Sequence, residues 1–144
     1  MDTATKFDLI MSPPTEEVLT EGDVKSALEI GLPLKHYIGF EISGLLHLGT
    51  GLVTMTKLVD LQKAGVKCSV FLADYHTWMN KKLGDDLKFI QKTAGQFYID
   101  AFRKSIEICG GDPNKVDFVL GSELYEKMGN DYWSTVIEVS KNTN

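Results

Sequence analysis

Residues 37–50, YIGFEISGLLHLGT, constrain the fold more than any other part of this 144-residue chain. The segment begins as an apolar strand, passes through a glycine-bearing loop and ends at the start of a helix, where His47 stands. Unpaired N–H groups and partial positive charge at a helix N-terminus favour phosphate binding. Glycines at 39, 44 and 49 let a ligand approach the backbone closely, and a histidine at this place can donate to phosphate oxygens. The segment therefore predicts a nucleotide-phosphate site in an α/β fold.

Strand and helix patterns alternate along the rest of the chain. Apolar runs predict strands over 37–41, 67–73 and 116–120. Helical spacing and stop signals predict the intervening and following helices, over 49–64, 75–82, 86–109, 123–128 and from 131 onwards. Such alternation is typical of a parallel sheet with right-handed crossovers. The predicted fold class is therefore α/β, a Rossmann-like parallel sheet with helices on both faces.

The chain divides into a helical segment, residues 1–34, and the first half of a Rossmann-like nucleotide-binding domain, residues 35–144. In the first segment the two prolines after Ser12 separate short helices. Thr15 is a candidate helix cap there, and a further helix is expected over 21–31. In the second segment the long amphipathic helix is expected to place one stripe on the core: Leu87, Ile90, Ala94, Phe97, Ala101, Phe102 and Ile106.

Three loops follow the predicted strands, over 41–49, 73–76 and 121–124. In open parallel sheets the ligand lies beyond the carboxyl ends of the strands. The predicted phosphate loop is one of the three, so we expect a binding crevice that all three loops share.

Composition narrows the function classes. The net charge is −5, so an extended basic surface for a large polyanion is not expected. Cys68 and Cys109 stand far apart and read as reduced core residues rather than as a disulfide or zinc site. No apolar run approaches the roughly 20 residues that span a bilayer, and the N-terminus has no signal-peptide pattern. A cytoplasmic location is therefore expected.

Three short blocks lie on the three loops: YIGFEISGLLHLG at 37–49, LADYHTWMN at 72–80 and GSE at 121–123. The first resembles the Y-x-G-F-E-x-S-G-x-x-H-x-G block of tyrosyl-tRNA synthetases of the archaeal and eukaryotic type. The second resembles their L-A-D-x-H-A-x-x-N segment, and the third their G-S-E segment after the third strand. These enzymes are class I aminoacyl-tRNA synthetases, whose first signature ends in His-x-Gly. Tryptophanyl-tRNA synthetases are close relatives that such short blocks separate less well.

The resemblance implies a tyrosine–tRNA ligase, which activates tyrosine with ATP and Mg²⁺ and transfers it to tRNA. It implies catalysis by His47, with Thr50 supplying a hydroxyl where many relatives carry a second histidine. Contacts with ATP are implied for Gly39, Glu41, Ser43, His47 and Gly49. Contacts with tyrosine are implied for Tyr37, Gly39, Phe71, Asp74 and His76. No protein-held metal is implied; the implied partners are tRNA(Tyr) and a second copy of the chain in a homodimer.

Several of these residues also have an ordinary structural explanation. Tyr37 would pass for a core aromatic of a strand, and Phe71 for a core residue or a wall of the pocket. Asp74 could cap a helix and His76 could pack against a neighbour. His36 is expected at the surface. Packing, rather than base stacking, is expected for the remaining aromatic residues of note, Trp78, Tyr132 and Trp133.

The sequence contains no KMSKS-like lysine loop, which class I synthetases use to hold the pyrophosphate of ATP. We therefore expect the N-terminal portion of a catalytic domain, with little activity alone and a tendency to self-associate through an exposed sheet edge. Two alternatives stay open: a truncated synthetase-like module that binds without ligation, and a relative of the tryptophanyl enzymes.

Overall fold

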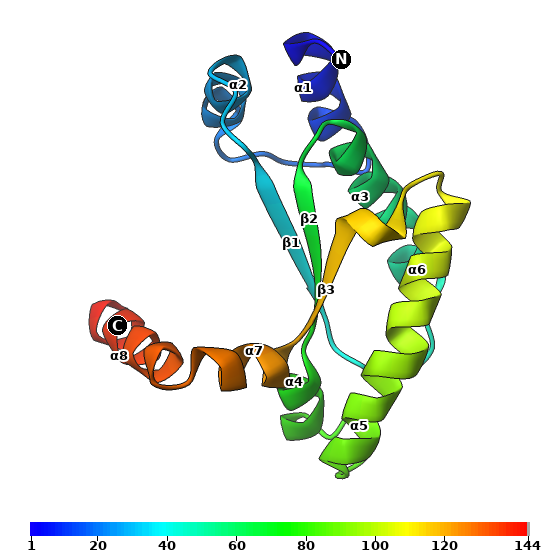
Figure 1. The fold of residues 1–144 in the computed structure, drawn as a ribbon, viewed down its shortest axis with the longest axis vertical. Helices are drawn as coiled ribbons and strands as arrows, with labels where there is room; N and C mark the ends of the chain where they lie inside the picture. The colour runs from blue at the N-terminus through cyan, green and yellow to red at the C-terminus, as the bar shows by residue number, and fades with distance from the viewer. Residues whose placement is uncertain (144) are drawn as a thin grey trace.

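Three parallel strands form the sheet in this computed structural model, which describes residues 1–143. Strands β1 (Lys35–Phe40), β2 (Lys67–Leu72) and β3 (Val116–Leu120) lie side by side in that order (Figure 1). Both pairings, β1 with β2 and β2 with β3, are parallel. The prediction of adjacent parallel strands is confirmed.

Helices fill both crossovers and follow the last strand. The crossover from β1 to β2 contains the π-helical turn η1 (Gly49–Val53) and α3 (Thr54–Lys63). The crossover from β2 to β3 contains α4 (Asp74–Met79), α5 (Leu87–Thr93), the π-helical turn η2 (Ala94–Tyr98), α6 (Ile99–Ile108) and the short 3-10 turn η3 (Pro113–Lys115). After β3 come α7 (Gly121–Met128) and α8 (Asn130–Asn142). The predicted α/β class is confirmed.

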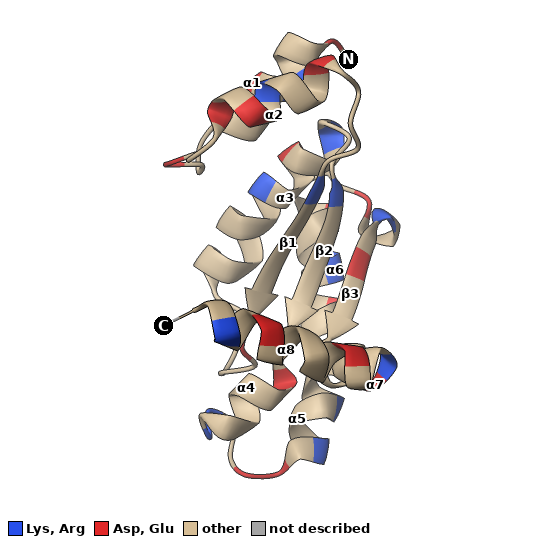
Figure 2. Ribbon diagram, turned by 90° about the vertical axis from the view of Figure 1, so that its left-hand side faces the viewer, with Lys and Arg blue, Asp and Glu red and all other residues tan. Residues whose placement is uncertain are grey.

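The hydrophobic core lies between the sheet and the helices α3 and α6. Alternate residues of β2, namely Cys68, Val70 and Leu72, are fully buried there, because successive side chains of a strand point to opposite faces. Both crossover helices lie on this side of the sheet, whereas α7 and α8 extend to the other side near the carboxyl ends (Figure 1). Figure 2 looks onto that second side, where the strands stay open above α8. Side chains on the open side are therefore free to face a ligand.

The N-terminal helices are attached to the sheet domain rather than separate from it. Helix α1 (Thr3–Met11) contacts both α2 (Glu21–Glu29) and α3. The ammonium group of Lys57, on α3, donates to the carbonyls of Leu9 and Ser12, each at 2.6 Å. Those carbonyls lie at the C-terminus of α1, where no helical N–H reaches them and a cation is favourable.

Three expectations about individual residues are wrong. Thr15 does not cap a helix, because residues 15–20 are not helical and its hydroxyl donates back to the Ile10 carbonyl. His36 is half-buried on the core side of β1, and burial lowers its pKa. Phe97 is 44% exposed, and Tyr98 takes the core position instead. In each case the position of the side chain depends on a contact between elements or on a turn of the helix, and the spacing of residues along the sequence does not show either.

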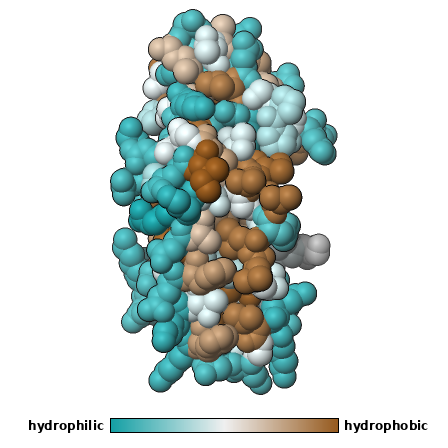
Figure 3. Space-filling model, turned by 90° about the vertical axis from the view of Figure 1, so that its right-hand side faces the viewer, coloured by the Kyte–Doolittle hydropathy of each residue, from teal (hydrophilic) through white to brown (hydrophobic). Residues whose placement is uncertain are grey.

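One side of the molecule carries apolar side chains that the described chain leaves uncovered. Figure 3 shows a band of them on the side that α5 and α6 form. Exposed apolar residues of this stretch of helix include Phe89, Phe97 and Ile108. Within residues 1–143, no helix has the length and apolarity needed to cross a membrane.

Candidate functional site

The carboxyl ends of the three strands bring the three predicted loops to one end of the sheet. The loop 41–48 follows β1, which ends at Phe40. Helix α4 begins at Asp74, two residues after the end of β2, and α7 begins at Gly121, directly after β3. Figure 1 shows α4 and α7 together below the strands. The three loops therefore meet at one end of the sheet, as expected, but the cavity described below is lined from the second and third loops and by no residue of the first.

Side chains of α4 hold the first part of the loop 41–48. The Ile42 N–H donates to the Thr77 hydroxyl at 2.8 Å in the core. The side-chain amide of Asn80 donates to the carboxylate of Glu41. The first and second sequence blocks are thus joined by hydrogen bonds, and the Glu41 carboxylate, which is expected to meet ATP, is already engaged on one oxygen.

His47 stands exposed at the end of this loop, directly before the helix. Its Nδ1 accepts a hydrogen bond from the Gly49 N–H at 3.2 Å. A neutral imidazole that accepts at Nδ1 carries its proton on Nε2, so Nε2 is the donor that a ligand would meet. A Cβ at Gly49 would lie 3.1 Å from Cε1 of the His47 ring, so any larger residue at 49 would crowd this arrangement. The prediction that a helix begins beneath His47 is confirmed by η1 and α3.

The hydroxyl of Thr50 is engaged within the same turn. It donates to the His47 carbonyl at 3.2 Å and accepts from the His47 N–H at 3.3 Å. In this arrangement Thr50 fixes the backbone of His47. Ser43, the other hydroxyl of the loop, is exposed.

Tyr37, Gly39 and Phe71 lie on the open side of the sheet. Tyr37 is 78% exposed, which excludes the explanation of a core aromatic for this chain. Gly39 pairs in register with Phe71, and a Cβ at 39 would lie 3.6 Å from Cδ1 of that ring. Phe71 therefore forms a wall on the open side and does not belong to the buried core. These residues make one continuous surface along β1 and β2.

Asp74 is buried and bonded within the chain. Its Oδ1 accepts from the N–H groups of Tyr75 at 2.9 Å and Ser122 at 3.0 Å. Its Oδ2 accepts from the Ser122 hydroxyl and from the Gln91 amide. The carboxylate therefore joins the beginnings of α4 and α7 to α5. His76, two residues further along α4, is exposed instead.

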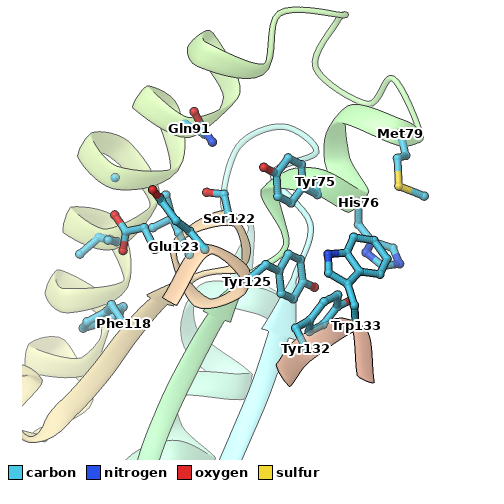
Figure 4. A pocket seen from close by; sticks show the side chains of 14 residues that line it. Tyr75, His76, Met79, Gln91, Phe118, Ser122, Glu123, Tyr125, Tyr132 and Trp133 are labelled. Carbon is cyan, nitrogen blue, oxygen red and sulfur yellow. The ribbon is translucent and has the colours of Figure 1, made fainter. Parts of the chain in front are cut away.

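A cavity of about 1070 Å³ opens beside α4 and α7 (Figure 4). Tyr75 stacks on Tyr125 with ring centroids 5.8 Å apart, and Tyr125 contacts Tyr132 at 4.3 Å. Figure 4 shows these rings with His76 and Trp133 on one side of the cavity, and Gln91, Ser122 and Glu123 on the other. The complete lining is Tyr75, His76, Met79, Gln91, Gly95, Ile99, Phe118, Leu120, Ser122, Glu123, Tyr125, Glu126, Tyr132 and Trp133.

The sequence did not identify Tyr125, and it assigned Tyr132 and Trp133 to packing. The signal that could have found Tyr125 is its position one helical turn after Gly121, at the start of the third block. Burial raises the pKa of the Tyr125 hydroxyl, and Tyr132 and Asp74 nearby act in the same direction. The hydroxyl therefore remains a proton donor at neutral pH. Within residues 1–143, no group of three or more His, Cys, Asp or Glu side chains could hold a metal ion.

The family of this chain follows from its match to one family model. The model for class I tRNA synthetases of the tryptophan and tyrosine type matches residues 31–143. This chain belongs to that synthetase family. The matched range includes all three strands and every loop of the site.

Several relatives of high identity are tyrosine enzymes of archaea. The tyrosine–tRNA ligase of Thermococcus kodakarensis is 56% identical over 142 residues, which are 99% of this chain and 37% of the ligase. The crystal structure of the Pyrococcus horikoshii tyrosyl-tRNA synthetase complexed with L-tyrosine matches with a TM-score of 0.94 and 54% identity over 100% of this chain and 38% of that one. The Aeropyrum pernix tyrosyl-tRNA synthetase matches with a TM-score of 0.83 and 38% identity, over 100% of this chain and 41% of that one. The chain thus spans somewhat more than a third of these relatives, and its resemblance to tyrosyl-tRNA synthetases is confirmed.

Proposed function

We propose that this chain forms the tyrosine- and ATP-binding part of a tyrosine–tRNA ligase. The observation that carries the proposal is the 56% identity to such a ligase over 99% of the chain. In this proposal residues 35–144 are the first half of the nucleotide-binding catalytic domain, and residues 1–34 are a helical segment that packs against it.

The reaction is the activation of tyrosine. An oxygen of the tyrosine carboxylate forms a bond to the α-phosphorus of ATP, the bond from that phosphorus to the bridging oxygen breaks, and pyrophosphate leaves. His47 donates from Nε2 to phosphate oxygens, where negative charge increases in the transition state. The hydrogen bond that Nδ1 accepts from Gly49 holds the ring in the tautomer that this role needs.

Tyrosine lies on the open side of the sheet. The hydroxyl of Tyr37 bonds the phenol of the substrate, Gly39 leaves room for it, and Phe71 forms a wall. A site that hydrogen-bonds a substrate hydroxyl rejects an analogue without it strongly. His76 lines the neighbouring cavity. Asp74 acts indirectly, because both of its oxygens are engaged by groups of the chain.

ATP lies over the loop 41–48 and the start of η1. Glu41 and Ser43 contact the nucleotide from the loop, and Gly39 and Gly49 let it approach the backbone. Thr50 supports His47 through the turn. Mg²⁺ arrives with the phosphates of ATP as part of the substrate complex.

The further partners are tRNA(Tyr), which receives the tyrosine, and a second copy of the chain. Helix α8 supports the homodimer, because Trp133, Ile137 and Val139 on it are exposed apolar residues. The location is the cytoplasm, where translation takes place.

The proposal is tested by ATP–pyrophosphate exchange with the protein at its natural length. Exchange that depends on tyrosine, and far less on phenylalanine or tryptophan, is the expected result. Exchange that depends on tryptophan would replace the proposal with the tryptophanyl alternative. Binding of ATP and tyrosine without any exchange would instead support the second candidate, a binding module without ligase activity.

A further inference from the structure

The long helix between β2 and β3 contains a π-helical turn, and that turn changes which aromatic residue faces the core. Residues Ile90, Ala94, Tyr98, Phe102 and Ile106 are all buried, with exposed fractions from 0% to 5%. They are spaced by four. An ideal α-helix has 3.6 residues per turn, so a spacing of four drifts by about 40° at each step. Over this stretch a continuous α-helix would turn Ile106 far away from Ile90.

The π turn η2 (Ala94–Tyr98) compensates for this drift. Its hydrogen bonds close over five residues rather than four, so it turns the chain back by part of a turn. As a result Tyr98 is 5% exposed while Phe97, the residue that α-helical spacing selects for the core, is 44% exposed. Exposing a phenylalanine to bury a tyrosine is unfavourable unless the tyrosine hydroxyl gains a partner.

The partner is the backbone of Gly44, in the loop that leads to His47. The Tyr98 hydroxyl accepts from the Gly44 N–H at 3.1 Å and donates to the Gly44 carbonyl. Gly44 has φ of +143°, a conformation that other residues rarely adopt. Ile42 before it is buried and Leu46 after it packs against the core. Tyr98 therefore anchors the loop at Gly44, which lies three residues before His47.

We propose that Tyr98 is a positioning residue for tyrosine activation, which acts on the phosphate-binding His47 through Gly44. The inference rests on the proposed function for its kinetic consequences, but the contact itself does not. π-helical turns occur frequently at functional sites, and here the turn has an identifiable purpose. It brings one hydroxyl from a helix more than fifty residues away in sequence to the loop before the reacting phosphates.

The variant Tyr98→Phe tests the proposal, because it removes the hydroxyl and keeps the ring that packs near Phe102, with centroids 6.2 Å apart. In the protein at its natural length we expect kcat for tyrosine-dependent pyrophosphate exchange to fall about 10- to 100-fold, the range for a small misplacement of a catalytic group. The KM for tyrosine should stay nearly unchanged, since Tyr37, Gly39 and Phe71 lie on the other side of the sheet. The matched control is Thr93→Val, which removes a hydroxyl that donates to the Phe89 carbonyl at 2.8 Å in the same helix. It should leave both constants unchanged.

A second measurement separates this inference from the proposed function. Amide hydrogen exchange at Gly44 should be faster in Tyr98→Phe than in the unmodified protein or in Thr93→Val. This holds whether or not the protein activates tyrosine. The inference is overturned if the rate of amide hydrogen exchange at Gly44 is the same in Tyr98→Phe, or if the Tyr98→Phe enzyme is active with an unaltered kcat. If the unmodified protein shows no tyrosine-dependent pyrophosphate exchange, the proposed function alone is overturned. The amide hydrogen exchange of Gly44 would then still decide whether Tyr98 holds the loop.

Discussion

Asp74 offers the sharpest test of how the site is held together, through two substitutions with different expected costs. The side chain is 0% exposed. One oxygen accepts from two backbone N–H groups, those of Tyr75 and Ser122, and the other accepts from the side chains of Ser122 and Gln91. Asp74→Ala removes all four acceptor contacts, whereas Asp74→Asn keeps the oxygen that serves the backbone.

The expected magnitudes follow from these contacts. In Asp74→Ala two backbone donors lose their acceptor near the core, at about 1–3 kcal/mol each, so we expect the free energy of unfolding to fall by about 2–6 kcal/mol in all. In Asp74→Asn the new NH₂ group faces the Ser122 hydroxyl and the Gln91 amide, and both of those groups can rotate to accept. The expected loss is therefore only about 0.5–1.5 kcal/mol.

Urea unfolding followed by circular dichroism measures both values. The control is Asp117→Ala, which removes a carboxylate from an exposed ion pair with Lys67 and should cost no more than about 1 kcal/mol. The reasoning is refuted if Asp74→Ala is as stable as that control. It is also refuted if Asp74→Asn loses as much stability as Asp74→Ala, because the backbone bonds would then not dominate.

Three further predictions concern substrate recognition, pH and assembly. In the proposed tyrosine–tRNA ligase, Tyr37→Phe should weaken the use of tyrosine and relax discrimination against phenylalanine, with little change in ATP affinity. His47→Ala should instead slow adenylation while tyrosine binding is retained. Steady-state kinetics of pyrophosphate exchange on both variants check this. Burial raises the pKa of the Cys68 thiol from 9.0 to about 11, so the folded state holds the thiol proton more tightly than the unfolded state does. The free energy of unfolding should therefore fall as the pH rises from about 9 towards 11. Alkaline unfolding curves of Cys68→Ala should lack that part of the decline. The isolated 144-residue chain should show little tyrosine activation, which robust tyrosine-dependent pyrophosphate exchange would contradict. It should also self-associate through the edge of β1 and its exposed apolar surface. A clean monomer in light scattering at high concentration would contradict that second expectation.

Much of the architecture could be predicted because it depends on local patterns. Continuous apolar runs marked β2 and β3, and the glycines around His47 marked a strand that passes through a loop into a helix. Parallel pairing followed from the alternation of elements, since helical connections of this length favour it. The three loops then had to meet at the carboxyl ends of the strands, which is why His47 and the first block could be assigned to a site from the sequence alone.

The tertiary structure decided what depends on partners distant in the chain. α-Helical spacing selected Phe97 for the core, but the π turn placed Tyr98 there, where its hydroxyl reaches Gly44. The resemblance implies a tyrosine contact for Asp74, and its place after a strand also allows a helix cap. Only the hydrogen bond from the Ser122 N–H, at 3.0 Å, shows that the carboxylate links two helices. Periodicity reports which side of an ideal element is apolar; it does not report a change of helical register or a hydrogen bond across forty-eight residues, because both are set by the packing of the elements against one another.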